Sequence, residues 1–132
     1  MNLETRVSQL MEPYTEAWNK GDLDAFASFW TEDGILWSAL GEELRGRAAI
    51  RAWAASQFHM TLNLVLEPTH SDSFVEVIFV VGNYACQRTQ PGPPNSRGGF
   101  TALLRETGDR KPRMHRLVAF PKVASTLDQR IA

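Results

Sequence analysis

The chain has 132 residues, of which 43% are hydrophobic, and its 14 basic and 15 acidic side chains leave a net charge of −1 at pH 7. This length fits a single domain, and the absence of any block of like charge argues against nucleic acid or an anionic membrane surface as a partner. No apolar run approaches the roughly 18 residues that a membrane helix needs. A lone cysteine, Cys86, and a first segment without an uninterrupted apolar core predict a cytoplasmic protein.

Two helices are predicted at the start of the chain. Apolar side chains recur at three- and four-residue steps over residues 3–19 and place Tyr14 on one apolar stripe. Pro13 is expected to bend this helix or displace its start, because it removes a backbone hydrogen bond. Gly21 can end the helix in the left-handed conformation, and the aspartate after it can cap a second helix over residues 22–30.

A turn and a third helix follow. Asp33 and Gly34 are predicted to turn the chain into a short strand over residues 35–37. Arg47 then opens a third helix whose shared face includes Trp53.

Alternating and β-branched residues after the third helix predict strands. The four expected strands span residues 61–70, 73–89, 98–107 and 113–120. The expected connections are a tight turn at 71–73, a long hairpin tip at 90–98 that is either a lid or an exposed loop, and a turn at 108–111. The sequence therefore predicts one α+β domain over residues 1–121, with three helices on one face of a curved antiparallel sheet, and a tail over 122–132.

The motifs "WNKGDLDAF", "FWTEDGILW" and "GRAAIRAW", followed by four strands, resemble the nuclear transport factor 2-like superfamily, which includes SnoaL-like cyclases and ketosteroid isomerases. The resemblance covers about residues 3–120 and implies a cystatin-like, cone-shaped α+β barrel. It also implies a homodimer paired through the sheet, in keeping with apolar residues expected on the outer sheet face. It does not imply one activity, because isomerases, dehydratases, epoxide hydrolases, cyclases and binding modules share this fold.

The comparison with ketosteroid isomerases implies roles for three positions. Tyr14 stands eight positions before Asp22, as the pocket tyrosine of that family stands before the aspartate of its Gly-Asp hinge. Ser38 falls where that family keeps its general base, and Ala102 falls nearest to its protonated carboxylic acid. Enolate chemistry needs a base within reach and donors aimed at the oxyanion. Ser38 has no useful basicity near neutral pH and Ala102 carries no donor, so steroid isomerisation is disfavoured.

Tyr14 and His115 are the candidate catalytic residues. Many relatives end the last strand with histidines, and a neutral imidazole such as that of His115 can act as a base near pH 7. The alternatives are a Tyr14 that packs in the core and a strand histidine bonded to its surroundings. The candidate ligand-binding residues, for which core packing is the alternative, are Trp18, Trp30, Trp37, Ser38, Trp53, Phe100 and Ala102.

No metal or cofactor is predicted. His59, His70 and His115 are too far apart for a local metal pair, and neither an HExxH motif nor a Cys-His cluster accompanies them. Arg88 and Arg105 are candidates to clamp a carboxylate, and the alternative is that they lie in water.

Two functions stay open at this point. The first is a SnoaL-like pocket protein that binds a small, largely apolar organic molecule and catalyses acid-base chemistry of the isomerase, cyclase or dehydratase type. In it Tyr14 is the donor, with Ser38 and His115 near the substrate. The second is a non-catalytic ligand-binding or dimerisation module. A cavity of about 300 Å³ or more around the Tyr14 hydroxyl would favour the first, and a packed cone would favour the second.

Overall fold

The computed structural model describes residues 2–89, 95–106, 108–109 and 111–121. Its helices are α1 (Leu3–Lys20), α2 (Leu23–Ser28) and α3 (Arg47–Gln57), with a 3-10 turn at Phe58–Met60. Its strands are β1 (Trp30–Trp37), β2 (Glu43–Arg45), β3 (Thr61–Phe74), β4 (Val77–Arg88), β5 (Asn95–Glu106) and β6 (Pro112–Pro121). The predicted tail at 122–132 and most of the predicted hairpin tip, residues 90–94, lie outside the described residues.

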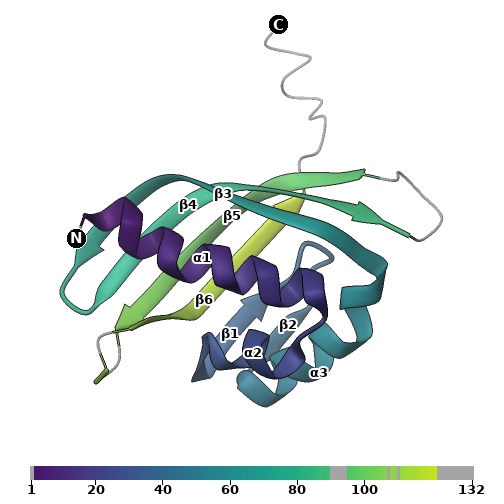
Figure 1. Cartoon of the computed structure of the whole chain (residues 1–132), viewed down its shortest axis with the longest axis horizontal. Coiled ribbons are helices and arrows are strands. Elements are labelled where there is room, and N and C mark those ends of the chain that lie inside the picture. The colour runs from purple at the N-terminus through teal and green to yellow at the C-terminus, as the bar shows by residue number, and fades with distance from the viewer. Residues whose placement is uncertain (1, 90–94, 107, 110, 122–132) are drawn as a thin grey trace, which may run out of the picture.

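The strands form a single six-stranded sheet in the order β2-β1-β6-β5-β4-β3. The meander from β3 to β6 is antiparallel, as predicted. β1 instead runs parallel to β6, so the sheet is mixed. Figure 1 shows α1 lying along one face of the curved sheet, with α2 and α3 gathered near β1 and β2. The predicted α+β class, with helices packed on a curved sheet, is confirmed.

Local hydrogen bonds explain where α1 begins and ends. The Asn2 side chain accepts a hydrogen bond of 2.8 Å from the Thr5 amide, so the helix starts at Leu3 and Pro13 does not displace its start. Gly21 closes the helix in the left-handed conformation, with φ of 70°. The buried stripe of α1 faces the sheet and consists of Val7, Leu10, Met11, Tyr14, Ala17 and Trp18.

The second helix is shorter than predicted. Asp22 caps it by accepting from the Ala25 amide at 3.1 Å, but α2 ends at Ser28 and Trp30 opens β1. Strand pairing explains the difference: Trp30 pairs with Met114 of β6, and the side chain of Trp30 is fully buried. Tertiary pairing thus ended a helix that the apolar spacing alone would have continued.

Three predicted turns also differ from the structure. Asp33 and Gly34 lie within β1, where the register against β6 shifts between Trp30 and Ile35, so they belong to a bulge. Residues 71–73 continue β3, because they pair with β4, and the hairpin turn follows instead with Glu76 at a φ of 62°. Residues 95–98 were predicted in the hairpin tip, but they form the start of β5.

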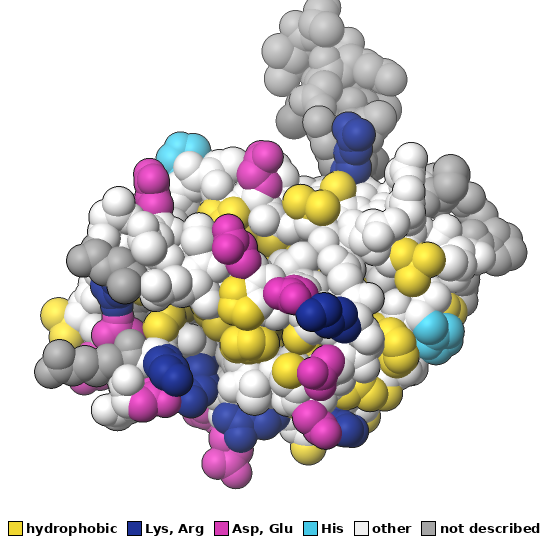
Figure 2. Space-filling view, in the orientation of Figure 1, with side chains coloured by type: hydrophobic (Ala, Val, Ile, Leu, Met, Phe, Trp, Pro, Cys, Tyr) yellow, Lys and Arg dark blue, Asp and Glu magenta, His cyan; other side chains and the backbone are white. Residues whose placement is uncertain are grey.

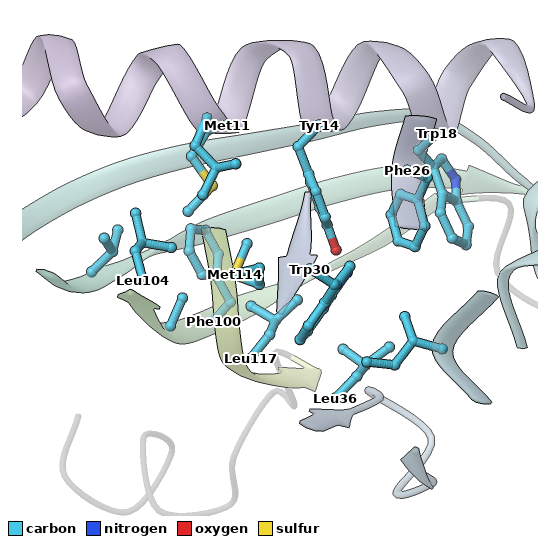
Figure 3. Close-up of a cluster of buried hydrophobic side chains, with 14 of the residues drawn as sticks. Met11, Tyr14, Trp18, Phe26, Trp30, Leu36, Phe100, Leu104, Met114 and Leu117 are labelled. Atoms are coloured by element: carbon cyan, nitrogen blue, oxygen red, sulfur yellow. The ribbon is translucent and has the colours of Figure 1, made fainter. Parts of the chain in front are cut away.

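The core lies between α1 and the inner face of the sheet, the face that α1 covers. In Figure 3, Met11, Tyr14 and Trp18 extend from α1 toward the sheet, where side chains such as Phe100 and Leu104 meet them. Alternate residues of β4 and β5 are buried, which identifies the inner face of each strand. On the helical side of the molecule, Figure 2 shows basic and acidic side chains intermixed rather than grouped by sign.

Candidate functional site

A cavity of about 120 Å³ lies inside the cone. Its lining comes from α1, α2 and α3, from the inner faces of β1, β3, β4, β5 and β6, and from the loop after β1. The deep residues Phe26 and Phe100 are almost fully buried, whereas Leu40 is 68% exposed. The cavity therefore has a closed apolar end and a mouth near Leu40.

The structure brings together five of the predicted site residues and leaves four apart. The cavity lining includes Tyr14, Trp18, Ser38, Trp53 and Phe100. The residues that do not line it are Trp30, Trp37, Ala102 and His115. Ala102 is buried in the core, and Trp37 donates from its indole nitrogen Nε1 to Glu43 Oε1 at 3.0 Å.

Tyr14 reaches the cavity from the middle of α1. Its ring packs on Phe26 with centroids 4.8 Å apart, and its hydroxyl points away from the helix toward Trp30 (Figure 3). Burial raises the pKa of Tyr14 strongly, and the nearby Trp30 indole offsets only part of that effect. The Trp30 indole nitrogen itself makes no hydrogen bond of standard geometry to the described residues. Tyr14 is therefore a neutral hydrogen-bond donor at pH 7.

Trp18 and Trp53 form an aromatic wall beside the cavity. Their ring centroids are 5.5 Å apart, and Trp18 Nε1 donates to the Thr61 carbonyl at 2.9 Å. Trp53 Nε1 donates to Glu42 Oε1 at 3.3 Å. These hydrogen bonds hold both indoles in place while their apolar faces remain available to the cavity.

The Ser38 hydroxyl is occupied by the loop that follows β1. Its Oγ accepts from the Leu40 amide at 3.3 Å and from the Glu42 amide at 3.2 Å, and it donates to Glu42 Oε1 at 3.3 Å. Ser38 therefore closes a turn at the cavity mouth, and its hydroxyl does not stand in for a general base.

Tyr84 is a cavity residue that the sequence reasoning missed. Its side chain is 8% exposed, and its hydroxyl has no hydrogen-bond partner among the described residues. The opposite residue on β5 is Gly98, and a Cβ there would meet both the Tyr84 ring and the backbone oxygen of Phe120. The missing side chain at Gly98 makes room for the ring. Parity with Ile78 and Val80 on β4 was the available signal, since all three share the inner face.

His115 lies in a different, polar environment at the border of β1 and β6. Its Nδ1 is 2.8 Å from Thr31 Oγ1 and 3.7 Å from Asp33 Oδ1. Burial lowers the pKa of His115, the charges of Arg116 and Arg105 lower it further, and Asp33 raises it in part. The imidazole is therefore neutral at pH 7 and bound to its surroundings, outside the cavity that Tyr14 enters.

Neither a metal centre nor a membrane span is found in the part of the chain that the structure describes. No group of three or more His, Cys, Asp or Glu side chains there is placed to hold a metal ion. None of its helices combines the length and the apolar character needed to cross a bilayer.

The model of the SnoaL-like domain family matches residues 11–102, which is most of the chain. The chain belongs to the SnoaL-like domain family. The match spans α1 from Met11 through most of β5, so it includes the helices and strands that carry Tyr14, Tyr84 and Phe100. No curated protein sequence matches the chain.

Solved structures share the fold of this SnoaL-like domain at low sequence identity. A ketosteroid isomerase-like protein from Erwinia carotovora atroseptica aligns with a TM-score of 0.78 and 17% identity over 93% of this chain and 99% of that one. A protein with a cystatin-like fold from Caulobacter vibrioides gives a TM-score of 0.79 and 16% identity, with 96% and 94% covered. A protein with a ketosteroid isomerase-like fold from Catenulispora acidiphila, in complex with trimethylamine, gives 0.65 and 20% identity, with 91% and 90% covered. At these identities the similarity establishes the fold.

The chemistry available in the cavity follows from its lining. Among the described lining residues there is no Asp, Glu or His, and the one charged side chain is Arg88. The site thus offers apolar contact surface, two buried phenol groups and one cation. It offers no ionised base for proton abstraction.

Proposed function

We propose that this SnoaL-like domain binds a small, largely apolar organic molecule in the cone cavity. The observation that carries the proposal is an apolar cavity lined by two buried tyrosines, Tyr14 and Tyr84, the second without a hydrogen-bond partner in the described part of the chain. Buried polar groups are normally satisfied, so a cavity-lining tyrosine whose hydroxyl lacks a partner in the described chain supports a ligand that carries an acceptor. Tyr14 would orient such a ligand as a neutral donor.

The size of the cavity limits the ligand. At about 120 Å³ it is smaller than the 300 Å³ expected for a drug-sized molecule. An engineered apolar cavity of about 150 Å³ in another protein binds benzene, so a single ring or a short chain is the upper size for this cavity as it stands. The Catenulispora protein of the same fold, in complex with trimethylamine, supports a ligand of few atoms.

Binding is better supported than proton-transfer catalysis. General acid-base chemistry needs a base within hydrogen-bond reach of the reacting atom, and the described lining supplies none. Burial raises the pKa of Tyr14, which makes the phenol a weaker acid. His115 is committed to Thr31 at the edge of β1, away from the lining. We therefore favour the non-catalytic ligand-binding module over the isomerase, cyclase or dehydratase type.

Ligand-observed NMR with benzene, toluene and phenol tests the proposal, together with the intrinsic fluorescence of the wall tryptophans. Ala119→Leu adds bulk to the cavity lining, and we expect it to abolish the binding signals. Ala48→Leu is the matched control, because Ala48 is exposed on α3, and we expect it to bind as the wild type does. Absence of binding to all three probes, or equal binding by Ala119→Leu, would refute the proposal.

We further propose that two chains pair through the outer face of the sheet, the face opposite α1. Val118 and Phe120 of β6 are exposed there, and Phe120 is 46% exposed although its ring covers Gly99. Exposed apolar side chains gathered on one sheet face mark an interaction surface.

Light scattering at micromolar concentration should give a dimer mass for the wild type and a monomer mass for Phe120→Lys. The control Val75→Lys changes a residue that is 90% exposed at the β3–β4 turn and should remain dimeric. A monomeric wild type would reject this pairing.

A further inference from the structure

Arg88 places a positive charge at the wall of the cavity, with no partner among the described residues. It is the last residue of β4 and shares the inner-face parity of Tyr84, because the two are four residues apart in the same strand. It lines the cavity and is partly buried. Its guanidinium makes no ion pair or hydrogen bond to any described residue. Nothing in the described chain therefore neutralises the one charge that the cavity wall carries.

The influence of the Arg88 charge extends to the inner face of the strand. Burial raises the pKa of the Cys86 thiol, and the Arg88 charge acts in the opposite direction and lowers it. Cys86 lies between Tyr84 and Arg88 on the same face. The parity of Arg88 with Tyr84 and its place in the cavity lining agree with a charge that acts on this face of the strand.

Tyr84 supplies a second donor on this row. Its hydroxyl is buried and unpartnered within the described chain, and residues four apart in a strand are separated by about 13 Å along its axis. Both residues line the same cavity. Two donors with no acidic side chain in the described lining favour a ligand that is an acceptor and carries negative charge.

We propose that the cavity selects small apolar monocarboxylic acids, of a single ring or a short chain, whose carboxylate is held by Arg88. This inference rests on the proposed ligand-binding function of the same cavity. The planar guanidinium matches the two oxygens of a carboxylate, and the apolar body of the acid extends toward Phe100 and Trp18. A neutral isostere keeps the apolar contacts but loses the charge-assisted hydrogen bonds. A cationic isostere is repelled.

Isothermal titration calorimetry at pH 7 with matched probes tests the inference. The probes are benzoate and phenylacetate, their amides benzamide and phenylacetamide, and the cation benzylamine. We expect each acid to bind roughly tenfold more tightly than its amide, the lower end of what a hydrogen bond to a charged group supplies at a partly exposed site. Benzylamine should bind more weakly than either amide. Added salt should reduce the preference for the acids.

Variants assign the preference to Arg88. Arg88→Gln should lower the affinity for each acid until it equals that for the matching amide, and Arg88→Lys should keep most of the preference because it keeps the charge. The control Arg97→Gln removes an exposed arginine from the neighbouring strand and should behave as the wild type. Thermal unfolding of each variant establishes that it is folded, and Arg88→Lys gives a second measurement if Arg88→Gln is not.

The outcomes separate this inference from the proposed function. A preference for acids that disappears in Arg88→Gln supports both. Equal affinity of the wild type for acids and amides, or an acid preference that survives Arg88→Gln, overturns the selection of carboxylates and leaves the apolar pocket standing. If no probe of either series binds, and the uncharged rings also fail to bind, both fall together.

Discussion

Two regions of this domain present hydroxyl groups in opposite settings. Tyr84 lines the cavity, and its buried hydroxyl has no hydrogen-bond partner among the described residues. At the border of β1 and β6, the Thr31 hydroxyl is hydrogen-bonded to His115, with Asp33 nearby. The described lining of the pocket therefore contains no carboxylate or imidazole, whereas the polar region contains both. A pocket of this kind suits binding, because a proton-transfer site needs donor and base in the same cavity.

The largest expected effect comes from Trp30, which connects the two regions. Its ring lies 6.4 Å from that of Tyr14 between centroids, and its backbone pairs with Met114, beside His115. Trp30→Ala should lower the free energy of unfolding by about 3–5 kcal/mol, because it leaves a large cavity in a fully buried position. Trp37→Ala is the control and should cost clearly less, since Trp37 is partly exposed. Urea unfolding measures the loss of stability in both variants. Equal losses would contradict the prediction that Trp30 contributes more to the free energy of unfolding than Trp37.

Gly98→Ala should disturb the cavity and leave the polar region at the border of β1 and β6 unchanged. The added methyl group would meet the Tyr84 ring and the backbone oxygen of Phe120, and overpacking of this kind costs about 1–3 kcal/mol. The matched substitution Gly108→Ala meets no atom of the described residues within 4 Å and should be close to neutral. Thermal unfolding compares the two. A neutral Gly98→Ala would show that β5 can shift away from β4 at this point.

Removal of each hydroxyl group should affect the free energy of unfolding differently. Thr31→Val deletes a hydrogen bond to His115 and should destabilise the domain by about 1 kcal/mol. Tyr84→Phe removes a buried hydroxyl without a described partner and should leave the free domain equally stable or more stable by up to about 1 kcal/mol. Denaturant unfolding without ligand is the measurement. Destabilisation by Tyr84→Phe would indicate that this hydroxyl is satisfied in solution.

The smallest expected effect is a pH dependence that belongs to the polar region. Because the pKa of His115 is lower in the folded state than in the unfolded chain, the unfolded chain binds more protons on acidification. The contribution of His115 is complete above the unfolded pKa, near 6.5, and stability is lost as the pH falls through the folded value. His115→Asn should therefore lose less stability than the wild type between pH 7 and pH 5.

Denaturant unfolding at a series of pH values measures this difference. His59→Asn serves as the control, because His59 is exposed in the 3-10 turn, and it should keep the wild-type dependence. A pH profile of His115→Asn identical to that of the wild type would contradict the assignment.

Local patterns predicted much of the fold because their causes are local. The apolar stripe of α1, the cap at Asp22 and the left-handed Gly21 depend on residues within one or two helical turns of each other. The motifs around these positions also led to the right superfamily, and they placed Tyr14 on the buried face. The alternation in β4 and β5 predicted strands for the same reason.

The composition of the site depended on contacts between segments far apart in the chain. Trp30 was predicted in a helix but lies in β1 because it pairs with β6. His115 lies beside Thr31 because β6 runs next to β1. Cross-strand packing against Gly98 gave Tyr84 its place in the cavity. Register and pairing between distant strands have no local signature, because each strand is compatible with several partners until the whole sheet is assembled. Local patterns in the chain thus predicted the cone and the tyrosine of its first helix, whereas the pairing of distant strands fixed which side chains line the pocket.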